Sequence, residues 1–85
     1  MEEDRYQDVC TYVRRLIEQG QLRPGDRLPT ERALSQDLGV SRGTVRDGLR
    51  LLESMGVLES RQGSGNYLSN HMGQYLAQSQ HFMLL

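Results

Sequence analysis

The chain has 85 residues, which limits it to one small domain and excludes a catalytic cleft built between two domains. Its sequence lacks any apolar run near the roughly 20 residues of a membrane span, and its acidic start is unlike a signal peptide, so we expect a cytoplasmic protein. The net charge of −1 argues weakly against a nucleic-acid binder, and the single cysteine excludes an internal disulfide or a cysteine-rich zinc module.

The first predicted helix is marked by apolar residues at steps of three, four and seven: Tyr6, Val9, Cys10, Val13, Leu16 and Ile17. Gly20 is suited to the left-handed residue that closes this helix. Because Cys10 lies on the apolar stripe, we expect it to be a buried structural thiol. A Pro24-Gly25 turn then leads into a short predicted strand at Arg27-Leu28, which Pro29 ends.

Two further helices are predicted close together. Thr30 can cap the first of them, which ends at Gly39 after about two turns. Ser41 can cap the next, which covers about residues 42–55 and ends at Gly56. Only three or four residues separate the two helices, which is the spacing of a helix-turn-helix.

After these helices the sequence pattern changes to that of strands. Residues 57–60 and 66–69 predict a hairpin whose Gly-rich tip is 61–65. The fold class is therefore mainly α with a small β-hairpin, a winged helix-turn-helix domain over residues 1–69 with a three-helix core and a two-stranded wing. Residues 70–85 end on large apolar side chains, and we interpret them as a linker and the start of a further helix that belongs to a truncated effector domain.

The third helix has the two faces expected of a DNA reader. Three arginines at intervals of four residues form a stripe on one face: Arg42, Arg46 and Arg50. The residues of a separate arc are expected to face the core: Val45, Leu49, Leu52 and Met55. Arginine can bond guanine O6 and N7 together, and the polar start of the helix, at Ser41, Gly43 and Thr44, can approach bases and phosphates. The alternative is a solvated helix face, since Asp47 and Glu53 lie near the stripe.

Other candidate contacts flank this helix. Arg32 opens the supporting helix and is either a DNA contact or a surface arginine near Glu31. The tip residues Arg61, Gln62 and Gly63 combine a cation, a polar probe and a small residue, as a minor-groove wing needs, although a plain flexible hairpin also fits.

The sequence gives no support to catalysis or to metal binding. It lacks a Ser/His/Asp set in a recognisable context, and His71 and His81 are too far apart in the sequence to form a metal site on one helix turn. We expect neither an enzyme nor a cofactor. The competing function is a winged-helix module that binds another protein and never touches DNA, because a fold does not fix a function.

Several motifs together resemble the DNA-binding domain of the GntR family of bacterial transcription regulators. They are LRPGDRLPTER at 22–32, LGVSRGTVR at 38–46, and the wing formed by GVL at 56–58, RQGSG at 61–65 and Tyr67-Leu68. The resemblance covers about residues 6–69. It implies a homodimer that binds a palindromic operator, and a C-terminal domain that binds a small-molecule effector. Residues 52–59 look more like the FadR-type subgroup than the HutC-type subgroup.

The resemblance also implies roles for individual residues. Arg32 resembles the family arginine that contacts DNA from the second helix, and Arg42 and Arg46 resemble the recognition-helix arginines. Ser41 and Thr44 match positions that contact phosphates, and Gln62 and Gly63 match the wing tip in the minor groove. One departure is Asp47-Gly48, where many relatives carry Glu-Ala. Because glycine costs a helix about 1 kcal/mol relative to alanine, we expect a weaker or bent third helix there.

Overall fold

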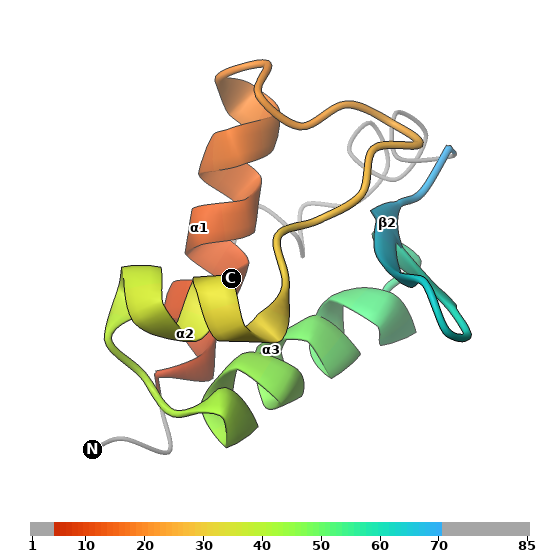
Figure 1. Ribbon diagram of the computed structural model, residues 1–85. Coiled ribbons are helices and arrows are strands. Elements are labelled where there is room, and N and C mark those ends of the chain that lie inside the picture. Colours follow the sequence, from red (N-terminus) through yellow and green to blue (C-terminus); the bar gives the residue numbers. More distant parts are fainter. Residues whose placement is uncertain (1–4, 71–85) are drawn as a thin grey trace.

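The computed structural model describes residues 5–70, which form three helices followed by a two-stranded antiparallel hairpin (Figure 1). The elements in chain order are α1 (Tyr6–Glu18), α2 (Glu31–Leu38), α3 (Arg42–Ser54), β1 (Leu58–Arg61) and β2 (Gly65–Leu68). In Figure 1, α1 stands nearly upright above the oblique α3, and the hairpin lies beside the C-terminal end of α3. This is the predicted winged helix-turn-helix. The helix predicted within 70–85 lies outside the described residues.

One aliphatic core joins all five elements. Its buried residues are Val9, Cys10, Val13, Leu22, Leu28, Leu34, Val40, Val45, Leu49, Leu52, Val57, Leu58 and Leu68. Each large aliphatic side chain removed from water stabilises the fold by roughly 1.5–3 kcal/mol. Met55, which the periodicity assigns to the core, is only half-buried because α3 ends at Ser54 and Met55 is its C-cap residue.

The crossing of α1 and α3 corrects the expectation for Gly48. The glycine lies inside an unbroken α3 and is buried against α1. A Cβ there would lie 2.7 Å from the Cβ of Val9 and 2.9 Å from the carbonyl oxygen of Tyr6. Gly48 therefore lets two helix backbones approach closely, and it is not a weak point in the helix.

The buried thiol of Cys10 belongs to the same crossing. Its Sγ lies 3.8 Å from the carbonyl oxygen of Gly48. Burial raises the pKa of Cys10 to about 11, which keeps it a neutral thiol at physiological pH. The prediction of a buried structural thiol is confirmed.

Two side-chain caps fix where α2 and α3 begin. The Oγ1 of Thr30 accepts a hydrogen bond from the backbone N–H of Ala33 at 3.1 Å, and the Oγ of Ser41 accepts one from Thr44 at 3.1 Å. The turn between the helices passes through Gly39, whose φ of 68° is the left-handed conformation that glycine tolerates best. The predicted caps and stop signal are confirmed, and they determine the angle at which α3 leaves α2.

The Thr30 cap gives a first testable prediction. Replacing Thr30 with Ala should lower the free energy of unfolding by about 1 kcal/mol, because the N–H of Ala33 loses its acceptor. Urea denaturation followed by circular dichroism measures this change. Thr30→Ser keeps the hydroxyl and should behave like the wild type, so equal loss in both variants would contradict a capping role.

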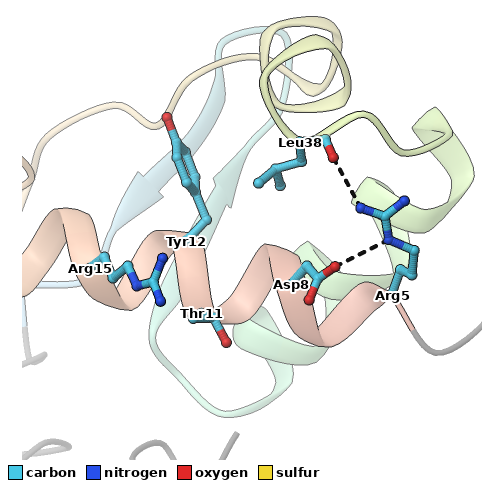
Figure 2. Close-up of a pocket in the computed structure, with 6 residues that line it drawn as sticks. All are labelled: Arg5, Asp8, Thr11, Tyr12, Arg15 and Leu38. Carbon is cyan, nitrogen blue, oxygen red and sulfur yellow. Dashed lines mark hydrogen bonds and ion pairs between the residues drawn. The ribbon is translucent and has the colours of Figure 1, made fainter.

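A polar clasp ties the start of α1 to the end of α2 (Figure 2). The guanidinium of Arg5 donates to the carbonyl oxygens of Leu38 at 3.2 Å and Gly39 at 3.3 Å, and its Nε donates to Asp8 at 3.1 Å. A cation at a helix C-terminus is favoured by the helix dipole, and here it also satisfies otherwise unpaired carbonyls. The clasp holds the helix-turn-helix turn against α1.

The wing differs from the prediction by one residue at each end. The expected strands were 57–60 and 66–69, whereas β1 and β2 run from Leu58 to Arg61 and from Gly65 to Leu68. Leu58 pairs with Leu68 and Arg61 with Gly65, which leaves a three-residue tip at 62–64. The short strand expected at Arg27 is a single bridge to Tyr67 on the other edge of β2.

Candidate nucleic-acid interface

The predicted division of α3 into a buried side and an exposed side is confirmed. Val45, Leu49 and Leu52 are buried, whereas the three arginines of the predicted stripe are exposed: Arg42, Arg46 and Arg50. The apolar side is anchored against α1 and α2, so the helix cannot roll its arginines inward without exposing core residues. The stripe is therefore held outward by the packing of the opposite side.

The N-terminal end of α3 divides its predicted contacts into two kinds. Ser41 and Gly43 are exposed, and Gly43 has only the Ser41 hydroxyl within 4 Å of an added Cβ. Thr44 is only 8% exposed, and its hydroxyl lies 2.9 Å from that of Ser41. The structure gives Thr44 a place in the helix cap, and its predicted phosphate contact stays a prediction. The open end of α3 is formed by Ser41 and Gly43.

An ion pair that the sequence did not indicate orients Arg46. The Nε and Nη2 of Arg46 donate to the two carboxylate oxygens of Glu31 at 3.2 Å and 3.1 Å. The expected rival partners, Asp47 and Glu53, are neighbours along α3, whereas Glu31 starts α2 and is 15 residues distant. The pair therefore depends on how α2 packs on α3, which spacing in the sequence does not show.

This geometry leaves part of the Arg46 guanidinium available. A guanidinium has five N–H donors, and Glu31 uses the edge formed by Nε and Nη2. The outer edge, which carries Nη1, is the one that can meet two acceptors of a guanine end-on. Hydrogen bonds from Arg46 lower the pKa of Glu31, so the carboxylate stays ionised and the pair persists into mildly acidic solution.

Two other predicted arginines share a groove. Arg32 and Arg42 line it together with Ser35 and Gln36, and its volume is about 310 Å³. The four lining residues offer two cations and two neutral polar groups, with no carboxylate among them. Such a lining suits a phosphate, because arginine donors match its oxygens in pairs.

The wing holds its predicted residues differently. Gln62 and Gly63 are exposed at the tip, as expected. The guanidinium carbon of Arg61 lies 4.0 Å from the ring centre of Tyr67. The Nη2 of Arg61 lies 3.9 Å from the Oε2 of Glu59. The Ser64 and Tyr67 hydroxyls are hydrogen-bonded, which braces the tip. Arg61 is thus partly engaged within the wing, although half of its side chain is exposed.

Comparison with known proteins identifies the family. The family model for the bacterial regulatory proteins of the gntR family matches residues 5–68. The chain belongs to the GntR family. It is 47% identical over 70 residues to the mannosyl-D-glycerate transport/metabolism system repressor MngR of Escherichia coli. The aligned region covers 82% of this chain and 29% of that repressor. It is also 45% identical over 53 residues to the regulator LutR of Bacillus subtilis, covering 62% of this chain and 24% of that one.

Solved structures agree with this assignment. The DNA-binding domain of AraR in complex with operator ORX1 has a TM-score of 0.72 and 38% identity, covering 76% of this chain and 78% of that chain. A GntR-family regulator from Listeria monocytogenes has a TM-score of 0.76 and 25% identity. The match covers 85% of this chain and 66% of that chain. The resemblance in the motifs and the winged helix-turn-helix fold are both confirmed.

Residues 5–70 contain no helix that is long and apolar enough to cross a membrane. In the same range no three His, Cys, Asp or Glu side chains are grouped so as to hold a metal ion. The chain spans less than a third of the length of MngR and of LutR. The FadR-type assignment, which concerns an effector domain, stays a prediction.

Proposed function

We infer that this chain binds double-stranded DNA in a sequence-specific manner as the operator-reading domain of a transcriptional regulator. The observation that carries the inference is the outward arginine face of α3, held by a buried opposite face and oriented by Glu31. The similar AraR domain has been solved on operator DNA, and the relative MngR is named a repressor. We propose that this regulator is also a repressor.

The proposed docking places α3 in the major groove. Arg42 and Arg46 read base edges there, and Arg50 extends the same stripe. Arg32 and the exposed start of α3 at Ser41 and Gly43 hold the phosphate backbone, while Thr44 preserves the cap beneath them. The tip at Gln62 and Gly63 enters the adjacent minor groove, where a small residue permits close approach.

The wider assembly is proposed on the family resemblance. Two copies of the chain bind the two halves of a palindromic operator as a homodimer, and a small-molecule effector bound by a C-terminal domain changes their spacing. The shared span of under a third of each relative is consistent with a separate effector domain. The protein is cytoplasmic, needs no cofactor and is not an enzyme in this proposal.

Selection from a random pool of duplexes tests DNA reading directly. We expect this chain to enrich one short motif, and its affinity for that motif to fall steeply between 50 and 200 mM KCl, because phosphate contacts release counterions. Weak binding by a single copy is expected to strengthen when two half-sites are placed on one duplex. Failure to enrich any motif at low salt would favour the protein-interaction module instead.

A further inference from the structure

The wing contains an arginine that comes from a distant part of the sequence. Arg27 lies before the helix-turn-helix, and it forms a bridge with Tyr67 on the free edge of β2. Hydrogen bonds from Leu28 to Asn66 and from Leu68 to Asp26, both 2.8 Å, fix this pairing. The segment around Arg27 is therefore attached to the free edge of the two-stranded wing through this single bridge.

The Arg27 side chain reaches toward the tip across a glycine. A Cβ at Gly65 would lie 3.0 Å from the Nε of Arg27 and 3.4 Å from its Nη2, so the guanidinium occupies the space that a side chain would fill. Gly65 follows directly after the tip at 62–64. The guanidinium is thus placed beside the part of the wing that approaches DNA in the proposed docking.

The two arginines of the wing differ in their partners. Arg61 is stacked on Tyr67 and lies near Glu59, which neutralises part of its charge. Arg27 is exposed, and within residues 5–70 its guanidinium takes part in no ion pair, hydrogen bond or ring contact. Of these two cations, Arg27 has the full set of donors available to a ligand.

Arg27 also shares a surface with the recognition helix. A groove of about 230 Å³ runs from Arg27 past Thr30 and Glu31 to the wing residue Asn66. A second groove, lined by Arg46 and Arg50, also includes Glu31 and Asn66. Glu31 and Asn66 line both grooves, so these two residues lie between Arg27 and the stripe residues Arg46 and Arg50.

We propose that Arg27 contacts a DNA phosphate beside the minor groove, and that it supplies the backbone-binding charge of the wing in place of Arg61. This role rests on the proposed function, DNA binding. Arginine forks suit phosphate oxygens, and a contact of this kind positions the duplex without reading its sequence. In this arrangement Gln62 and Gly63 enter the minor groove, while Arg27 binds a phosphate of the backbone beside it.

The test compares three variants of the whole chain: Arg27→Gln, Arg27→Lys and Arg61→Gln. Each is titrated with the duplex enriched by the wild type and with a scrambled duplex of the same composition, at several KCl concentrations. Arg27→Gln should weaken binding to both duplexes by the same factor, about 3- to 10-fold, and should lower the slope of log affinity against log salt by about 0.9. Arg27→Lys should restore most of that slope, and Arg61→Gln should change it little.

The outcomes separate this proposal from the proposed function. An unchanged affinity and slope in Arg27→Gln, while the wild type still selects its motif, would overturn the role of Arg27 and leave DNA reading intact. A loss confined to Arg61→Gln would overturn it as well. A wild type that enriches no duplex would refute the proposed function, and the role of Arg27 with it. Thermal unfolding of each variant checks that the variant is folded. Misfolding alone would reduce the fraction of active protein and leave the salt slope unchanged, so a lower slope reports a lost phosphate contact.

Discussion

Replacing Gly48 with Ala is expected to destabilise the domain by about 1–3 kcal/mol, although alanine is the better helix former. The new Cβ would lie 2.7 Å from the Cβ of Val9 and 2.9 Å from the carbonyl oxygen of Tyr6. Neither atom is the end of a flexible side chain, so α1 and α3 must move apart to relieve the overlap. The helix-propensity gain of about 1 kcal/mol offsets only part of that cost.

Gly43 provides the matched control on the same helix. Its only neighbour within 4 Å of an added Cβ is the Ser41 hydroxyl at 3.9 Å. Gly43→Ala should therefore leave stability unchanged or raise it slightly through helix propensity. Urea denaturation of the two variants gives the comparison, and a Gly48→Ala protein as stable as the wild type would contradict the close-packed crossing.

The behaviour of Gly48 shows where the sequence is informative and where it is not. Propensity treats this glycine as a weak point, because it considers the helix alone. The distance between α1 and α3 is set by the packing of both helices, and that distance determines whether a methyl group fits. An alanine at position 48 would fit only if α1 lay farther from α3 or if the residue at position 9 were smaller.

Local signals in the sequence predict the helix-turn-helix within one residue. Thr30, Gly39 and Ser41 act through neighbours three or four residues along the chain, so their effect is visible in the sequence. The start of β1 is displaced by one residue because Val57, although apolar and buried, donates its N–H to the carbonyl oxygen of Leu52 at 3.0 Å and closes α3. Burial alone does not distinguish such a residue from the start of a strand.

The candidate site shows the same division. The exposed stripe of α3 follows from helical periodicity, so the sequence predicts Arg42, Arg46 and Arg50 as outward residues. The pairing of Arg46 with Glu31, and the position of Arg27 beside Gly65, join residues far apart in the chain. Both depend on how the elements dock, which no spacing within one element reveals.

Replacing Arg46 with Ala is expected to reduce affinity for the selected operator by about 5- to 150-fold, while changing affinity for a scrambled duplex much less. The reason is geometric: Glu31 holds the guanidinium by its Nε and Nη2 edge, so the outer edge is oriented before DNA arrives. Arg46→Lys keeps the charge but lacks the two parallel donors, so it should lose most of the same discrimination. Titration of both duplexes measures the ratio of the two affinities.

Arg15→Ala is the matched control for this measurement. Arg15 is an exposed arginine on α1, where it lines the groove that also contains Arg5 and Leu38, so its removal changes net charge by the same amount outside the proposed DNA surface. It should weaken both duplexes slightly and equally, through long-range electrostatics. If Arg46→Ala also changed both affinities equally, Arg46 would be a phosphate contact, and base reading would have to come from Arg42 or Arg50. A change confined to the operator, at one base pair of each half-site, would identify the base that the Glu31-oriented guanidinium reads.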